Sequence, residues 1–113
     1  MLEFKKDFSD PLNCPVTKAM GLIGGKWKPI ILWAIFGGIN RFGQLQRAIP
    51  TISKKVLTAQ LRELEHDALI TRKVYPVVPP KVVYSIAPLG KKTTPMIIAL
   101  REFGLELAEN DAR

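Results

Sequence analysis

The hydrophobic and polar positions between residues 53 and 66 follow the period of an amphipathic helix. Leu57, Leu61 and Leu64 recur at i, i+4 and i+7, which places them on one side of a helix. Ser53 precedes them and is a good N-cap, because its hydroxyl can accept a hydrogen bond from a backbone N–H of the first turn. The opposite side carries Lys55, Ala59, Arg62 and His66, flanked by Lys54 and Thr58. The pattern predicts a helix anchored by leucines that presents cations and short polar groups outward.

Such a helix fits the major groove of DNA, where its N-terminal residues meet base edges and phosphates. Charged outer faces are also common on ordinary surface helices. An amphipathic helix with solvated charges, for example with Arg62 paired to Glu65, is therefore an open alternative. The neighbouring segments help to decide between the two.

Two helices are expected on the N-terminal side. The first begins with Cys14 as N-cap and Pro15 at the first helical position, where a missing N–H costs nothing. The apolar residues that it is expected to bury are Val16, Met20 and Ile23. The second covers residues 27–36 and is apolar on nearly all sides, which predicts a central buried helix. A pair of glycines is expected to end each helix.

A helix-turn-helix is predicted next. Residues 42–49 are expected to form a short helix in which Phe42, Leu45 and Ile49 share a face. The segment Pro50-Thr51-Ile52 then makes a tight connection into the helix that follows Ser53. Two short helices joined by about four residues, the second of them basic, are typical of this motif.

A hairpin and a last helix complete the chain. Residues 70–75 and 82–86 are β-rich runs, separated by a proline-stiffened tip that carries no acidic side chain. Arg72, Lys73 and Lys81 bracket this tip. Residues 88–108 predict one long helix with a kink at Pro95.

The order helix, helix, helix-turn-helix, hairpin, helix is that of a winged helix. We therefore expect a mainly α fold with a small β-hairpin wing, a winged helix-turn-helix. The expected domain covers residues 14–110, after an N-terminal arm of residues 1–13 and before a tail of residues 111–113. In this fold one helix enters the major groove while the hairpin reaches the adjacent minor groove or the backbone, which favours DNA binding over a merely solvated helix.

The charge is concentrated on the same part of the chain. The 113 residues carry a net charge of +7. Residues 41–87 hold eight Lys or Arg against three Asp or Glu, whereas residues 1–40 contribute +2 and residues 88–113 contribute zero. An uneven basic excess of this kind indicates a polyanion binder.

Several other function classes lack support in the sequence. The apolar run of residues 29–36 is too short to cross a bilayer, and the start of the chain does not resemble a secretory leader, so we expect a cytoplasmic protein without a membrane partner. His66 and Cys14 offer no metal-ligand set, and no phosphate loop or nucleophile elbow is present. We therefore expect no enzyme activity, no metal and no cofactor.

Cys14 is open to two interpretations. A thiol at a helix N-terminus, with Lys18 one turn away, has its thiolate favoured by the helix dipole and a nearby cation, which suits oxidation or attack on electrophiles. The alternative is a small, half-buried hydrophobe that only caps the helix. With one cysteine in the chain, any disulfide would join two subunits or capture a small thiol.

The terminal segments predict a homodimer. The apolar residues of the last helix cover more than one side of it, and loose aromatics in the arm need cover, so a partner surface is expected. The residues expected at this interface are Phe4, Phe8, Val16, Ile97, Leu100, Phe103 and Leu107.

Four motifs carry a resemblance to a known family. They are Cys-Pro at 14–15, Ile-Gly-Gly-Lys-Trp at 23–27, Leu-Arg-Glu-Leu-Glu at 61–65 and Val-Pro-Pro-Lys-Val-Val-Tyr at 78–84. Over residues 14 to about 104 the chain closely resembles the HxlR-type bacterial transcription regulators, relatives of the MarR group.

The resemblance implies a homodimer that binds a pseudo-palindromic operator in double-stranded DNA, and in some members the equivalent of Cys14 is a sensor. It also implies that the groove-facing residues are Ser53, Lys55, Thr58, Ala59 and Arg62, and that the Pro79-Pro80 tip with Lys81 is the wing.

The chain departs from the family pattern at two positions. Ala68 stands where glycine is usual, and in a left-handed conformation alanine costs on the order of 1 kcal/mol relative to glycine. Ala87 stands where a capping threonine is common, which removes a cap worth about 1 kcal/mol. Both changes affect stability and wing placement rather than the basic surface.

The sequence thus predicts a sequence-specific DNA-binding transcription regulator. The candidate DNA-binding residues are Arg41, Gln44, Ser53, Lys54, Lys55, Thr58, Ala59, Arg62, Arg72, Lys73, Pro79, Pro80 and Lys81. The alternative is a winged-helix interaction module that binds a protein instead of duplex DNA. The sequence names no small-molecule effector.

Overall fold

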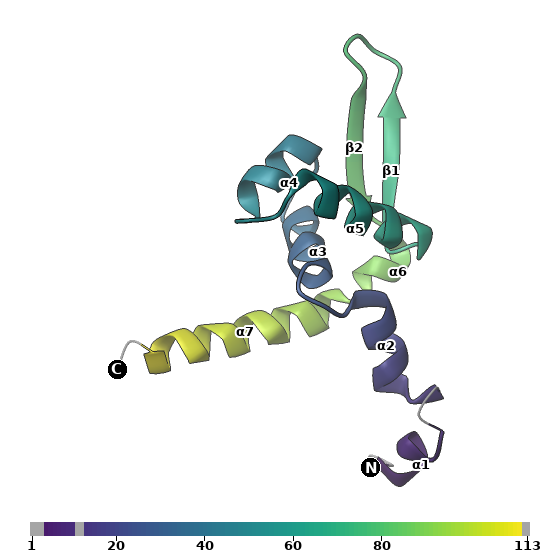
Figure 1. Ribbon diagram of the computed structural model, residues 1–113, viewed down its shortest axis with the longest axis vertical. Coiled ribbons are helices and arrows are strands. Elements are labelled where there is room, and N and C mark those ends of the chain that lie inside the picture. Colours follow the sequence, from purple (N-terminus) through teal and green to yellow (C-terminus); the bar gives the residue numbers. More distant parts are fainter. Residues whose placement is uncertain (1–3, 11–12, 112–113) are drawn as a thin grey trace.

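The computed structural model describes residues 4–10 and 13–111 of the chain. The helices are α1 (Phe4–Ser9), α2 (Pro15–Ile23), α3 (Lys28–Phe36), α4 (Phe42–Ala48), α5 (Lys54–His66), α6 (Pro88–Lys91) and α7 (Thr94–Asp111), and the strands are β1 (Ile70–Tyr75) and β2 (Lys81–Ile86) (Figure 1). This is the winged helix-turn-helix that the sequence predicts, with α4 and α5 as the motif and the two strands as the wing.

The leucines of α5 lie in the core, as predicted. Leu57, Leu61 and Leu64 are between 0 and 2% exposed. They belong to one cluster with apolar side chains of other elements, among them Ile31, Leu32, Ile35, Leu45, Ile49, Ile70 and Ile97. Because burial of a leucine side chain contributes about 1.5–3 kcal/mol, this cluster fixes which face of α5 remains outside.

Ser53 caps α5 as predicted. Its backbone is extended, and its hydroxyl oxygen accepts a hydrogen bond from the N–H of Val56 over 3.1 Å. The turn between α4 and α5 contains Thr51 with a positive φ of 66°. The turn and the cap together set the direction in which α5 leaves α4.

The wing is a two-stranded antiparallel hairpin that projects from the helices (Figure 1). Its register pairs Ile70 with Ile86 at the base and Tyr75 with Lys81 at the far end. The N–H of Tyr84 donates to the carbonyl of Asn40 over 2.9 Å, which ties β2 to the segment between α3 and α4. The hairpin is therefore anchored on the body of the domain along its lower half.

Ala68 and Ala87 are the two residues at which the chain departs from the family pattern. Ala68 has a φ of 61°, the left-handed conformation in which alanine costs about 1 kcal/mol relative to glycine. Ala87 is the N-cap of α6 and makes no side-chain capping hydrogen bond. Both costs fall at the base of the wing.

The prediction of one kinked helix over residues 88–108 is wrong. The chain forms the short α6 and then the separate α7, with a turn at Lys92 and Thr93 between them. The Thr93 hydroxyl donates to the carbonyl of Gly90 over 2.6 Å, which closes the end of α6. Pro95 then lies in the first turn of α7, where its missing N–H leaves no helical hydrogen bond unmade.

Two predictions of burial are also wrong. In α2, Val16 is 65% exposed and Met20 is 56% exposed, so only Ile23 of the three apolar residues is buried within the chain. In α3, Ile30 and Phe36 are 44% and 51% exposed. Neighbouring elements cover only one side of each helix, which the apolar composition alone does not reveal.

Candidate nucleic-acid interface

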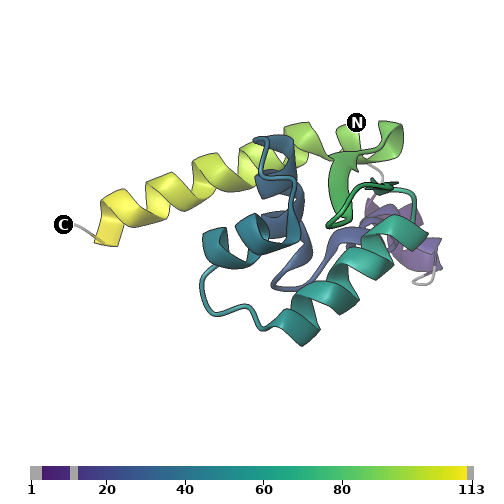
Figure 2. The same cartoon turned by 90° about the horizontal axis from the view of Figure 1, so that it is seen from above.

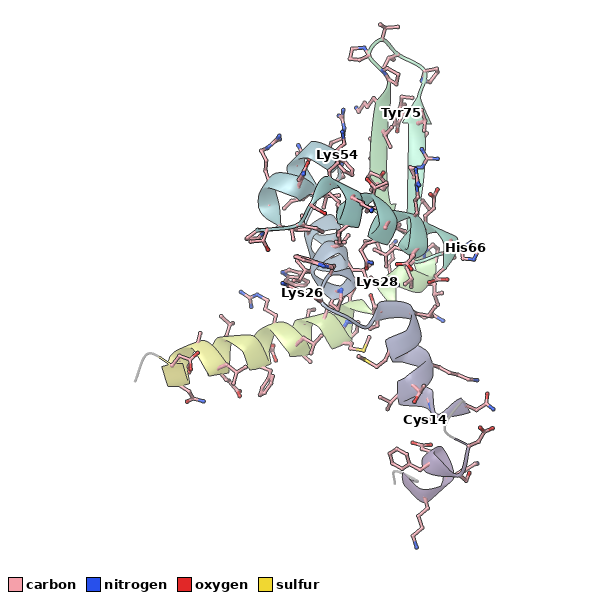
Figure 3. All side chains as sticks on the ribbon, viewed as in Figure 1. Cys14, Lys26, Lys28, Lys54, His66 and Tyr75 are labelled. Atoms are coloured by element: carbon pink, nitrogen blue, oxygen red, sulfur yellow. The ribbon has the colours of Figure 1, made fainter. Side chains whose placement is uncertain are left out.

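The cations of the helix-turn-helix and the wing lie at one end of the molecule. In Figure 3, Lys54 at the start of α5 and Tyr75 near the end of β1 occupy the upper part of the view, whereas Cys14 lies near the opposite end. The exposed cations of α4, α5 and the hairpin are Arg47, Lys54, Lys55, Arg62, Arg72, Lys73 and Lys81. Arg41, at the start of α4, is partly exposed.

The outer face of α5 is arranged as the sequence predicts. Lys54, Lys55, Ala59 and Arg62 are exposed on the side opposite the buried leucines. Thr58 is partly buried, and its hydroxyl donates to the carbonyl of Lys54 over 2.8 Å. Ser53 is exposed but uses its hydroxyl as the helix cap. The free charged groups of this face are therefore those of Lys54, Lys55 and Arg62.

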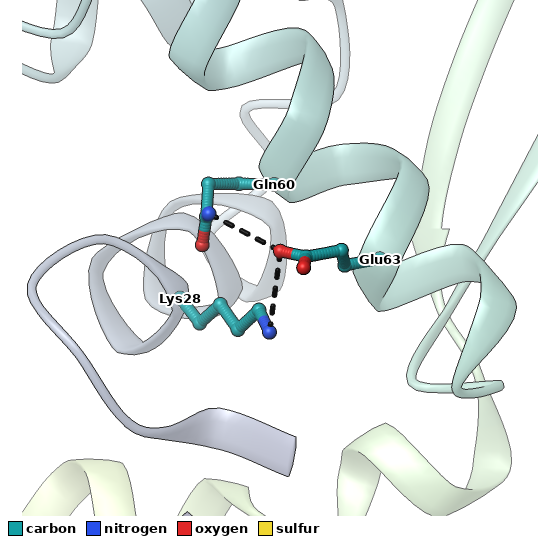
Figure 4. A network of polar contacts seen from close by, with 3 residues as sticks. All are labelled: Lys28, Gln60 and Glu63. Carbon is teal, nitrogen blue, oxygen red and sulfur yellow. Dashed lines mark hydrogen bonds and ion pairs between the residues drawn. The ribbon is translucent and has the colours of Figure 1, made fainter. Parts of the chain in front are cut away.

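An ion pair and a hydrogen bond hold the flank of α5 against α3. Lys28 Nζ lies 3.4 Å from Glu63 Oε2, and the Lys28 side chain is only 12% exposed. Gln60 Nε2 donates to the same carboxylate oxygen over 3.2 Å (Figure 4). The ion pair and the hydrogen bond both involve the Glu63 carboxylate on the flank of α5. They therefore position the helix without occupying its outer face.

A recess separates the start of α4 from the wing. It has a volume of about 490 Å³ and is lined by Arg41, Phe42, Gly43, Gln44, Arg47, Pro80 and Val82. Arg41 and Gln44 are brought together here as predicted members of the site. Arg47 is a basic residue that the sequence analysis missed; its place one helical turn after Gln44 could have indicated it.

A second cleft lies between α5 and the wing. It has a volume of about 390 Å³ and is lined by Phe42, Thr58, Leu61, Arg62, Glu65, Arg72 and Tyr84. Glu65 pairs with Arg72 across the cleft, at 3.5 Å between Oε1 and Nε, rather than with Arg62. Burial raises the pKa of Tyr84, against the opposing effect of Arg72. Within the described residues Arg62 has no ion-pair partner, so its charge is available to a ligand.

The tip of the wing is apolar and flanked by cations. Val78 is fully exposed and Val77 is 52% exposed, and Pro79 and Pro80 are exposed beside them. The ammonium groups of Lys73 and Lys81 lie 4.9 Å and 5.4 Å from the centroid of the Tyr75 ring. Such cation–π contacts hold both charges at the far end of the two strands.

Cys14 is the N-cap of α2, as predicted, and is 4% exposed. The neutral thiol makes no capping hydrogen bond of normal geometry. Its pKa is nevertheless lowered, chiefly by the backbone N–H and the hydroxyl of Thr17, which favour the thiolate; burial opposes this effect. Backbone N–H groups of the helix N-terminus thus lower the pKa as the sequence predicts, the Thr17 hydroxyl adds to their effect, and Lys18 is not among the causes.

Most of the residues predicted at a dimer interface are exposed, but one of them is buried in the core of its own chain. Phe8, Val16, Leu100, Phe103 and Leu107 are between 47% and 71% exposed and available to a partner. Ile97 is 6% exposed and belongs to the core of its own chain, so it does not fit the predicted interface. The side chain of Phe4 lies outside the described residues. Seen from above, α7 runs away from the other helices (Figure 2).

The described ranges 4–10 and 13–111 contain no group of three or more His, Cys, Asp or Glu side chains placed to hold a metal ion. They also contain no helix with the length and apolar character needed to span a bilayer.

The fold and the basic end of the molecule define a winged helix-turn-helix protein. Residues 22–112 match the model of the HxlR-like helix-turn-helix. The chain is 40% identical to the HTH-type transcriptional regulator YybR of Bacillus subtilis (strain 168) over 104 residues, which cover 92% of this chain and 83% of YybR. The chain therefore belongs to the HxlR-like family and is a transcriptional regulator of the helix-turn-helix type.

Solved structures agree with this assignment. The redox regulator HypR in its oxidized form is 42% identical and superimposes with a TM-score of 0.80, over 82% of this chain and 96% of HypR. A MarR-family transcriptional regulator from Porphyromonas gingivalis W83 is 45% identical, with a TM-score of 0.75, over 83% of this chain and 92% of that one. These relatives are regulators rather than enzymes.

Proposed function

We propose that this protein is a sequence-specific regulator that binds double-stranded DNA in the cytoplasm, as a homodimer on a pseudo-palindromic operator. The observation that carries the proposal is the outer face of α5, where Lys54, Lys55 and Arg62 are exposed opposite the buried leucines. Cations on the first turns of a helix of this kind meet phosphates and the O6 and N7 edge of guanine in the major groove.

The homodimer is supported by the apolar surface of the terminal helices. Leu100, Phe103 and Leu107 are exposed on α7, and Phe8 and Val16 are exposed on α1 and α2. A two-fold axis through such a surface pairs identical patches on both subunits. The two copies of α5 are then expected about 34 Å apart, one turn of DNA.

Replacing Lys55 or Arg62 by alanine should weaken operator binding. Loss of a contact to a base costs about 1–3 kcal/mol, whereas loss of a contact to a phosphate weakens binding to all sequences alike and lowers the salt slope by about 1. The measurement is an anisotropy titration with a duplex selected from a random pool. Lys91→Ala is the matched control, because Lys91 is an exposed cation on α6 and is not among the candidate DNA-binding residues. Unchanged affinity of both α5 variants would contradict the placement of this helix in the groove.

The same titration separates DNA binding from the alternative of a protein-interaction module. Binding to duplex DNA should weaken steeply with added salt, because phosphate contacts release condensed counterions. A protein that ignores duplex DNA at low salt and binds a protein partner without salt dependence would support the alternative.

We further propose that Cys14 senses oxidants or electrophiles. Its lowered pKa favours the nucleophilic thiolate, and the similar protein HypR is described as a redox regulator. Because this chain has one cysteine, the oxidised form would be a disulfide to a second subunit or to a small thiol.

The rate at which iodoacetamide alkylates Cys14 should reach half its maximum at a lower pH than the same rate does for a free cysteine. In this reaction the thiolate sulfur forms a bond to carbon and iodide leaves. Thr17→Val should raise the midpoint, since it removes the hydroxyl that favours the thiolate. The midpoint is compared rather than the absolute rate, because Cys14 is only 4% exposed. A midpoint at or above that of free cysteine would leave Cys14 as a structural cap.

A further inference from the structure

The cleft between α5 and the wing carries an excess of positive charge. Arg62 comes from α5, Arg72 from β1 and Tyr84 from β2, so three elements send polar groups into one space of about 390 Å³. The Glu65 carboxylate lies 3.5 Å from Arg72 and is the acid that lines this cleft. Two arginines facing one acid leave a positive charge without a counter-ion.

We propose that this cleft binds one phosphate of the DNA backbone, through the guanidinium groups of Arg62 and Arg72 and the hydroxyl of Tyr84. The proposal rests on the proposed function and adds the position at which the DNA backbone passes over the protein. When α5 occupies a major groove and the wing the adjacent minor groove, the backbone that separates the two grooves has to pass between them. The cleft is the space between those two elements.

The donors in the cleft suit a phosphate. Guanidinium groups present several N–H donors in a planar fork that matches phosphate oxygens, and a phenol adds one O–H donor. Thr58 contributes no free donor, because its hydroxyl already donates to the carbonyl of Lys54. Phe42 and Leu61 also line the cleft, and apolar walls strengthen a charge-assisted hydrogen bond by limiting access of water.

Glu65 acts as the internal counter-ion of this site. It pairs with Arg72, and the two side chains are 38% and 45% exposed, so the pair is solvated and weak. In the free protein it holds Arg72 in the cleft. When a phosphate enters, the same carboxylate repels it, so Glu65 positions an arginine while it lowers the affinity for DNA.

Three substitutions test the site on the selected duplex. Arg72→Gln should lower affinity about tenfold and reduce the slope of log K against log salt by about 1, as loss of one phosphate contact predicts. Tyr84→Phe should lower affinity about threefold with an unchanged slope, because it removes a neutral donor. Glu65→Gln should raise affinity about threefold. Lys92→Gln, at an exposed cation that follows α6, is the charge-matched control and should bind like the wild type.

A second measurement identifies the phosphate. Duplexes that carry one neutral methylphosphonate at successive positions should reveal a position at which the wild type loses more affinity than Arg72→Gln does, because the variant has already lost one contact to that phosphate. Equal losses in both proteins at every position would overturn the proposal, as would unchanged binding by Arg72→Gln and Tyr84→Phe with folded spectra. Saturable competition by inorganic phosphate, beyond that of chloride at equal ionic strength, would assign the cleft to a free phosphate instead. If the wild type binds no duplex at all, it is the proposed function that fails.

Discussion

Phe103→Glu should give a monomeric protein whose affinity for a full operator is lower by about 10²–10⁴-fold. Phe103 is 58% exposed on α7, with Leu100 and Leu107 one turn away on either side. A carboxylate at this position would have to lose its hydration within an apolar interface, which costs more than the contact contributes. Without the dimer, each half-site binds separately and the gain from two linked contacts is lost.

Light scattering gives the mass of the variant, and anisotropy gives its affinity for full and half operators. Asn110→Glu places the same acid on the same helix at a polar, exposed position and should leave both measurements unchanged. A dimeric Phe103→Glu protein that binds the full operator normally would refute the assigned interface.

Gly90→Ala is the second change with a large expected effect, here on stability. A Cβ atom at this position would lie 2.0 Å from the carbonyl oxygen of Leu69 and 3.1 Å from Cγ2 of Ile86. That carbonyl also accepts the hydrogen bond from the N–H of Ala87 over 3.0 Å, so it cannot move freely. We expect the free energy of unfolding to fall by about 3 kcal/mol, the upper part of the range for overpacking.

Urea unfolding measures this loss, and Gly21→Ala is its matched control. Gly21 lies within α2 and a Cβ there meets nothing within 4 Å, so alanine should raise stability by about 0.5–1 kcal/mol through its better helix propensity. Equal stability of Gly90→Ala and the wild type would show that α6 can move away from the base of the wing.

The elements with a clear local pattern could be predicted from the sequence. The period of Leu57, Leu61 and Leu64 predicts the buried side of α5, and the capping residue Ser53 predicts where the helix begins. The β-rich runs give the wing to within one residue, because turn-forming prolines separate them. The outward cations of α5 follow directly, since a helix buries one face.

The remaining features depend on contacts between distant parts of the chain. The pairing of Glu65 with Arg72 instead of Arg62 requires β1 to lie beside α5, which no local spacing states. The place of Ile97 in the core depends on the packing of α7 against α3, although most of its helix is exposed. The break after α6 arises because Thr93 closes that helix on Gly90.

Beyond Ile97, the described part of α7 up to Asp111 is exposed at every residue. A helix of this length without packing is only marginally stable in water. In a homodimer that covers it, acquisition of structure by the C-terminal segment and association of the subunits become one equilibrium, governed by mass action. The cellular concentration of the proposed homodimer would then set the fraction of the protein that is folded and able to bind its operator. Dilution alone would therefore reduce operator binding.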